Sequence, residues 1–249
     1  MNARRLAFAA AGALALAGLD APAAADTTKE TPGSPCTPGG GQGTGNPCNG
    51  NNGNPSPEGN AKEKVSYDNH PDPFTIGRPG NARGAFINQI GEQDVATITQ
   101  TAKTQYARVD QTGDFNEADV AQSGTGAHYV LAAQQGDYNE LDLAQGGPSA
   151  QVAFVQQSGN FNEMTLNQQG GLMTSGVAAS QLGNNNAMEL AQSGSNNQAR
   201  LVQNGSGNAM TASQTGGNNQ LSWTQTGDNL SDLAISQTGG RALAVTQSR

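Results

Sequence analysis

The chain is poor in charged, aromatic and apolar residues. Charged side chains make up 13% of its 249 residues, aromatic ones 4% and hydrophobic ones 34%, whereas glycine alone occurs 34 times. A chain with so little apolar surface does not build an ordinary globular core. It is either disordered or built from repeats, and regular spacing of its residues decides between the two.

Three functional classes are disfavoured because the chain has little positive charge, no long apolar run and few candidate catalytic residues. The net charge is −8, so electrostatic capture of nucleic acid or of an anionic membrane is not expected. Beyond the N-terminus, no apolar run approaches the roughly 20 residues that span a bilayer. The only histidines are His70 and His128, and no nucleophile sits in a recognisable motif. We therefore expect no enzyme activity, no metal and no cofactor.

Residues 1–25 have the three parts of a secretory signal peptide. Arg4 and Arg5 supply the positive start, residues 6–19 the apolar stretch, and residues 23–25 (AAA) a small-residue cleavage site. An uncleaved membrane anchor is the alternative, disfavoured because the apolar run is short and rich in alanine. The sequence predicts export, with no membrane span once the signal is removed.

Residues 26–80 have the composition of a flexible, disordered linker. They are dense in proline, glycine and asparagine, show no hydrophobic period, and cannot bury enough apolar surface to offset chain entropy. Cys36 and Cys48 lie here and are candidates for a disulfide, because an exported chain meets oxidising conditions. A metal site is the weaker alternative, since no histidine lies near them in the sequence.

A repeat occupies the rest of the chain, which we take as a repeat domain over residues 81–249. Its clearest copies are residues 111–122 (QTGDFNEADVAQ), 134–145 (QQGDYNELDLAQ) and 157–168 (QSGNFNEMTLNQ). Looser copies begin at Gln181, Gln192 and Gln214. The shared template is Gln-x-Gly-x-x-Asn-x-apolar-x-apolar-x-Gln.

Each repeat predicts a strand followed by a turn. Small or apolar residues lie two and four positions before each glutamine, as Ala107 and Val109 do before Gln111. This period of two indicates a strand with one buried face. Glycine with Asp, Asn or Ser follows, which is turn chemistry because glycine adopts a positive φ at little cost. The predicted turn glycines include Gly91, Gly113, Gly136, Gly159, Gly183, Gly205 and Gly227.

Regular and irregular turns alternate, so successive turns fall on two sides of the molecule. The structural unit is then two strands, about 22 to 24 residues, forming one coil. We predict an all-β fold, a parallel β-solenoid in which about fifteen strands form two parallel sheets that face each other across a thin core. About seven and a half coils at about 4.8 Å per layer give a height of roughly 35 Å.

The recurring amides are predicted to form ladders along the stack. Each side-chain amide can donate to one neighbouring layer and accept from the other, which satisfies buried groups that would otherwise cost about 1–3 kcal/mol each. Solvent-exposed glutamine in a polar tract is the alternative. The predicted ladder and core amides are Gln89, Gln100, Gln111, Asn116, Gln122, Gln134, Asn139, Gln145, Gln157, Asn162, Gln168, Gln181, Asn186, Gln192, Asn197, Gln203, Gln214, Gln225, Gln237 and Gln247.

Two further columns follow from the same spacing. Phe115, Tyr138 and Phe161 share one turn position and are expected to stack one coil apart, as edge packing rather than as a catalytic or glycan-binding site. An acidic column is formed by Glu117, Glu140 and Glu163, flanked by Asp119 and Asp142. It is a solvated face, a gatekeeper that slows association, or a weak site of cation bridging.

The template resembles the curlin repeat of bacterial curli subunits, over about residues 85–249. All positions of Gln-x-Gly-x-x-Asn-x-Ala-x-x-x-Gln are fitted by Gln111, Gly113, Asn116, Ala118 and Gln122, and again by Gln192, Gly194, Asn197, Ala199 and Gln203. The resemblance implies an extracellular amyloid fibre subunit with roles in adhesion and biofilm matrix. It also implies an outer-membrane export channel and a nucleator as partners, and leaves open whether this chain is the major subunit or the nucleator.

Both ends of the stack are expected to be open. The last strand runs to Gln247, and the first, near Ala85, follows the linker, so no capping segment is predicted. Open strand edges template further strands, so the predicted function is self-assembly into a fibre, with a second copy as the partner. A monomeric β-solenoid that binds ice or glycan is the alternative.

Overall fold

The structure is a computed structural model that describes residues 63–249. The predicted signal peptide, the Cys36–Cys48 pair and most of the predicted linker lie outside the described residues.

Every regular element in the described part of the chain is a strand, which confirms the all-β prediction. The bounds are β1 Lys64–Asp68, β2 Gly84–Ile90, β3 Val95–Gln100, β4 Tyr106–Thr112, β5 Glu117–Gln122, β6 Tyr129–Gln135, β7 Glu140–Gly146, β8 Gln151–Ser158, β9 Glu163–Gly170, β10 Ser175–Leu182, β11 Ala187–Ser195, β12 Gln198–Asn204, β13 Ala209–Gly217, β14 Gln220–Thr226, β15 Leu233–Thr238 and β16 Ala242–Ser248. No helix in this part is long and apolar enough to cross a membrane.

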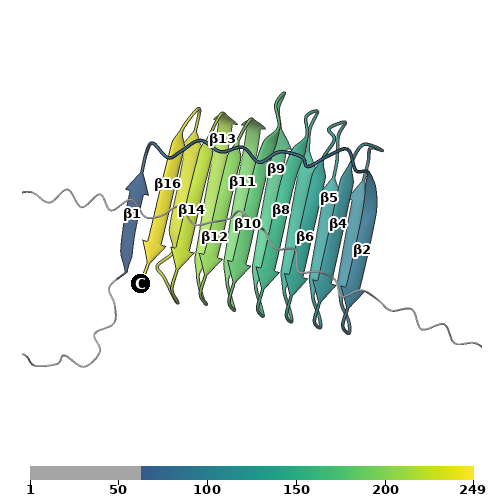
Figure 1. The fold of residues 1–249 in the computed structure, drawn as a ribbon, viewed down its shortest axis with the longest axis horizontal. Helices are drawn as coiled ribbons and strands as arrows, with labels where there is room; N and C mark the ends of the chain where they lie inside the picture. The colour runs from purple at the N-terminus through teal and green to yellow at the C-terminus, as the bar shows by residue number, and fades with distance from the viewer. Residues whose placement is uncertain (1–62) are drawn as a thin grey trace, which may run out of the picture. The chain divides into compact units, whose positions relative to one another are not determined.

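The repeat strands alternate between two sheets, as the turn pattern predicts. The even-numbered strands β2 to β16 form one sheet in sequence order, and β3 to β15 form the other. Neighbouring repeat strands pair in parallel, whereas β1 is added antiparallel to β16 and completes a nine-stranded sheet. Figure 1 shows the strands stacked in this order from β2 to β16. The repeats therefore form a β-solenoid whose coil is one strand from each sheet.

Pairing keeps every repeat residue next to its counterpart one coil away. Gln111 pairs with Gln134 and Gln134 with Gln157, and the other sheet aligns Gln122 with Gln145 in the same way. A slip of one residue would turn the buried set outward. The regular spacing of the sequence is thus reproduced as columns of like residues.

The core is a single layer of apolar side chains between the two sheets. It combines small residues such as Ala107 and Ala153 with larger ones such as Leu141 and Trp223, all of them buried. Alternate residues of most repeat strands point outward, as the burial pattern of β5 illustrates. The thin core follows from the small side chains that the repeat supplies.

The turn glycines allow the coils to approach closely. All seven that were predicted have positive φ, for example 120° at Gly113. A Cβ on Gly113 would lie 2.1 Å from the carbonyl oxygen of Gly136 in the next coil. Two residues later in the same turns, Phe115, Tyr138 and Phe161 also have positive φ, near 57–59°. That conformation is uncommon for aromatic residues.

The expected domain boundary at residue 80 does not agree with the structure. β1 lies inside the range expected to be linker, and residues 71–83 cross the face of the nine-stranded sheet from β16 to β2 (Figure 1). We call residues 71–80 the strap. Ile76 of the strap is buried, and its N–H donates to Gln198 Oε1 at 2.8 Å. The strap is ordered despite its composition because it packs on the apolar surface of the sheet instead of building a core of its own.

Candidate functional site: the amide ladders and the two ends of the stack

The glutamines of the nine-stranded sheet form one continuous ladder. In each layer Nε2 donates to Oε1 of the glutamine one coil further along the chain, at 2.8–3.0 Å. The ladder runs through Gln89, Gln111, Gln134, Gln157, Gln181, Gln203, Gln225 and Gln247. All of these except Gln89 are buried, as the ladder interpretation expects and the solvent-exposed interpretation does not.

A second ladder with the same direction runs through the seven-stranded sheet. Its donor–acceptor distances are 2.7–2.9 Å. It comprises Gln100, Gln122, Gln145, Gln168, Gln192, Gln214 and Gln237. In both ladders the Nε2 donors face the C-terminal end of the stack and the Oε1 acceptors face the N-terminal end. The stack therefore has a defined polarity.

The same amides also join one sheet to the other. Each Nε2 has a second hydrogen, and Gln111 donates to the carbonyl oxygen of Val95 across the core, while Gln122 donates to that of Tyr106. Gln134 does the same with Glu117 at 3.0 Å. A glutamine therefore satisfies two acceptors, one in the next coil and one in the facing sheet, so its loss leaves several polar groups unpaired, at about 1–3 kcal/mol for each that is buried.

The predicted asparagines fall into two columns rather than one. In the first, the N–H and Nδ2 of Asn139 donate to Asn116 Oδ1, and Nδ2 also donates to the carbonyl oxygen of Gly159. Asn162 and Asn186 repeat this pattern. These side chains fix the turn that follows β4, β6, β8 and β10.

Asn197 belongs to the turns on the opposite side. Its N–H donates to Ser175 Oγ, and its Oδ1 accepts from the N–H and Nδ2 of Asn219. His128 occupies the equivalent position two coils before Ser175, where it is buried. The His128 Nδ1 accepts from the N–H of Gln151, and burial lowers the pKa of the ring. The contacts of this histidine are therefore structural ones within the turn.

The aromatic turn column stacks as predicted. The ring centroids of Phe115 and Tyr138 lie 4.7 Å apart, and those of Tyr138 and Phe161 lie 4.9 Å apart, with nearly parallel planes. All three rings remain exposed. The stack covers one edge of the molecule over three successive coils.

The acidic column is also in register. Glu117 pairs with Glu140 and Glu140 with Glu163, while Asp119 pairs with Asp142. Burial raises the pKa of the Glu140 carboxyl, and the nearby charges of Glu163, Asp142 and Glu117 raise it further. Within residues 63–249, no three His, Cys, Asp or Glu side chains are placed to hold a metal.

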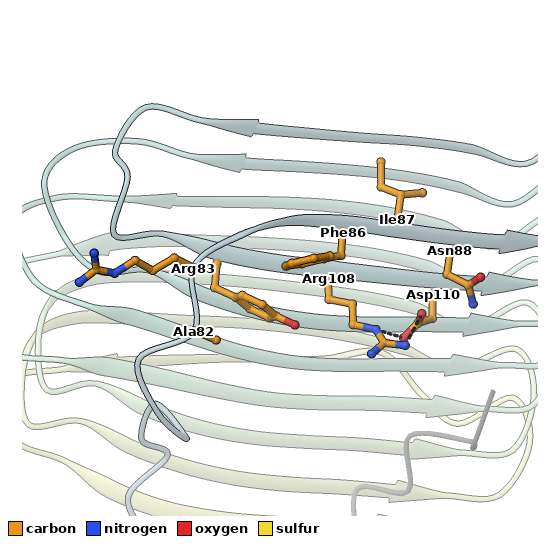
Figure 2. A pocket seen from close by; sticks show the side chains of 8 residues that line it. Ala82, Arg83, Phe86, Ile87, Asn88, Arg108 and Asp110 are labelled. Atoms are coloured by element: carbon orange, nitrogen blue, oxygen red, sulfur yellow. Dashed lines mark hydrogen bonds and ion pairs between the residues drawn. The ribbon is translucent and has the colours of Figure 1, made fainter. Parts of the chain in front are cut away.

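An aromatic face on the outside of the nine-stranded sheet was not predicted. Tyr106 and Tyr129 stack with centroids 4.8 Å apart, and Phe86 and Phe154 lie beside them. Figure 2 shows Phe86, Arg108 and Asp110 lining a shallow pocket at the β2 and β4 end, with Arg108 and Asp110 ion-paired at 2.8 Å. The sequence signal for this face is the presence of aromatic residues at outward positions of neighbouring strands.

Among residues 63–249, no strand covers the N-terminal end of the stack, which agrees with the predicted open end. Ile87 of β2 is 45% exposed and Ile98 of β3 is only partly buried, although the residues at the same repeat positions one coil further along are buried. Within the described residues, no group donates to Oε1 of Gln89 or Gln100, the first glutamines of the two ladders. This end presents unused strand edges, apolar side chains and amide acceptors together.

The prediction of an open C-terminal end is wrong for the nine-stranded sheet. β1 pairs with the outer edge of β16, and Val245 of that last layer is only 2% exposed. The Glu63 carboxylate accepts from Gln247 Nε2 and from the N–H and Oγ of Ser231. Residues before the first repeat, not after the last one, supply this cap, so the sequence around the last repeat contains no sign of it.

Comparison with known families identifies the repeat. Residues 183–216 match the model of a family described as the curlin associated repeat. This stretch covers β11 and β12 and nearly all of β13, and includes Gln192, Asn197 and Gln203 of the template. No curated protein and no solved structure matches the chain significantly. The chain therefore carries the curlin associated repeat, folded as a stacked β-solenoid.

Proposed function

We propose that this protein is a secreted structural subunit that polymerises end to end into an extracellular, curli-like amyloid fibre for adhesion and biofilm matrix. The observation that carries the proposal is the N-terminal end of the stack, where, within residues 63–249, the outer edges of β2 and β3 have no partner strand and the core-facing Ile87 and Ile98 are incompletely buried. Exposed edges of this kind are what natural β proteins usually block.

The polarity of the ladders favours a head-to-tail contact. Gln89 and Gln100 present carbonyl acceptors at the N-terminal end, and both ladders donate toward the C-terminal end. A second copy placed on the C-terminal end would continue both ladders and both parallel sheets. A contact that repeats the same rotation and translation gives an open filament rather than a closed ring.

The location and the other partners rest on the family likeness. A curlin repeat behind a predicted signal peptide supports export to the cell surface, an outer-membrane export channel and a nucleator subunit. The partner that the fold itself supports is a second copy of the same chain. The roles of major subunit and nucleator both remain compatible with the repeat.

Electron microscopy and X-ray fibre diffraction on the refolded chain test the proposal. We expect unbranched fibres with reflections at about 4.7–4.8 Å and about 10 Å, the spacings between strands and between sheets. Protein that stays monomeric and fails to bind amyloid dyes over days at micromolar concentration would contradict it.

The cap at the C-terminal end supports one other function, a monomeric β-solenoid that binds ice or glycan. Capped ends are the usual property of soluble repeat proteins, and β1 covers one of the two sheet edges at this end. Light scattering separates the two functions. Thermal hysteresis or glycan binding by a species with the mass of one chain would favour the binding module.

A further inference from the structure

We propose that β1 is a built-in competitor of fibre growth: it occupies the edge of β16 that the next copy would use, so each new contact requires its release. This inference rests on the proposed function and assigns a regulatory role to residues 63–69. It concerns the end of the stack that the repeats alone would leave open.

The first observation is that β1 and an incoming strand need the same main-chain groups. β1 pairs with β16 along its length, from Lys64 opposite Ser248 to Asp68 opposite Ala244. On its inner side, β16 is already paired with β14. A second copy would add its β2 in parallel, as all repeat strands do, whereas β1 is antiparallel. The two cannot be bound at once.

The second observation is that Glu63 takes the place of a ladder glutamine. Every earlier glutamine of this ladder donates Nε2 to the Oε1 of the next layer, and Gln247 donates to Glu63 Oε1 instead. The other carboxylate oxygen, Oε2, accepts from Ser231 and lies 3.9 Å from an Arg249 nitrogen. The carboxylate thus ends the ladder where Gln89 of another copy would continue it.

The third observation is that β1 is held weakly compared with a repeat strand. All five of its residues are exposed, including Val65 and Tyr67, whereas a typical repeat strand buries alternate side chains. Its attachment is therefore main-chain pairing, one long hydrogen bond from Ser66 Oγ to the carbonyl oxygen of Thr246 at 3.5 Å, and the contacts of Glu63. Strands with few buried apolar contacts open at lower free-energy cost than the core.

The strap keeps a released β1 close to its site. The ring of Phe74 lies under the Arg200 guanidinium, with 5.0 Å to the ring centroid, and the Phe74 carbonyl accepts from Gln220 Nε2. Gly176 makes room for Ile76, since a Cβ on it would lie 2.5 Å from the Ile76 Cβ. Only residues 69–73 separate β1 from Phe74, so rebinding is intramolecular and competes at a high effective concentration.

The test uses the full chain with paired substitutions in β1. Val65→Pro with Ser66→Pro removes two successive N–H donors, at least one of which faces β16. The matched control, Val65→Thr with Ser66→Thr, keeps the donors and the strand propensity. Glu63→Leu is an independent variant that removes the carboxylate. None of these residues belongs to the repeats.

Two measurements decide the outcome. We expect seeded fibre growth to accelerate roughly tenfold in the proline and Glu63→Leu variants and not in the threonine control, equivalent to about 1.4 kcal/mol of competition. Hydrogen exchange of the β16 amides in the monomer should rise in the same variants.

The failures of the two proposals are distinguishable. Fibres that grow at the wild-type rate in every variant, or unchanged exchange of β16, would overturn the competition while leaving the fibre function intact. Absence of fibres from the wild type and all variants would overturn both, even if exchange showed that β1 covers β16.

Discussion

The two ends of the stack are made from the same repeat but differ in what covers them. At the N-terminal end, Ile87 is 45% exposed, whereas Val245, at the same repeat position in the last layer, is 2% exposed. The repeat does not distinguish these positions, since both lie two residues before a ladder glutamine. The difference comes from β1 and Glu63, which lie outside the repeats. The last layer of the nine-stranded sheet is therefore covered, whereas its first layer is not.

The largest effect is expected from breaking the ladder between the two ends. Replacing Gln134, Gln157 and Gln181 with Leu removes three successive rungs and leaves their neighbours and facing carbonyls unpaired. At about 1–3 kcal/mol per unpaired group, the free energy of unfolding should fall by several kcal/mol.

Chemical denaturation of the monomer measures this loss, and fibre growth should slow in parallel. Gln135→Leu is the matched control, because that side chain is exposed on the neighbouring position of the same strand. Equal stability of the triple variant and the control would show that the ladder contributes little.

A charged side chain at the N-terminal end should prevent a second copy from binding there. Both ends of the stack would then be blocked. Ile87→Lys places an ammonium group where a second copy would bury it, which costs several kcal/mol for an unpaired charge. We expect seeded growth to fall by about a hundredfold or more, while the monomer keeps its stability because Ile87 is already exposed.

Phe86→Lys provides the comparison, since Phe86 is similarly exposed but points to the outer face of the same strand. Similar growth defects in both variants would mean that charge on β2 acts generally and not through the end of the stack.

Replacing the ladder glutamine at one end should change the stability of the monomer by a different amount from replacing its equivalent at the other end. Gln247→Leu removes a donor to Glu63 and Ser231 and an acceptor for Gln225, so we expect a loss of about 1–3 kcal/mol. Gln89→Leu removes one donor from an exposed side chain and should change stability by less than about 0.5 kcal/mol.

Thermal unfolding of the two single variants measures both effects. A larger loss for Gln89→Leu than for Gln247→Leu would contradict the assignment of the covered and open ends.

The smallest effect is a dependence of growth on pH. The raised pKa of Glu140 means that the folded chain takes up this proton early as the pH falls, which relieves the repulsion in the acidic column. Hydrogen bonds from Ser231 and Gln247 lower the pKa of Glu63, so the stability that it contributes is lost only at still lower pH.

Lowering the pH from 7 toward about 4, near the ordinary pKa of a glutamate, should therefore speed growth through the column before it loosens the cap. Glu140→Gln should remove much of this acceleration. Glu189→Gln is the control, because its neighbours in the register are Thr165 and Thr211. Growth that slows on acidification would count against the gatekeeper interpretation.

Much of the candidate site could be predicted because it is periodic. Gln134, Gln157 and Gln181 recur at constant offsets from apolar residues, so strand direction, burial and register follow from one another. The division of the asparagines was less accessible, since Asn139 and Asn197 have the same local pattern but lie in turns on opposite sides. Which side a turn occupies depends on counting strands, not on local sequence.

Residues 63–80 could not be placed from their pattern. Glu63 and Gln247 are hydrogen-bonded across 184 positions of the chain, and Ile76 packs against Gly176. Neither contact leaves a local signal, because β1 buries no alternate side chains and the strap has no repeat. Composition rich in proline and asparagine predicts a linker whether or not a sheet is available for it to cross.

The sequence by itself determined the strand, the coil and the columns of like residues, because side-chain alternation and a constant repeat length leave one register that buries the apolar set. Only the tertiary structure decided how the two ends differ. An edge is covered or open according to which distant segment reaches it, and here the main-chain groups of β16 accept β1, a strand that resembles none of the repeats.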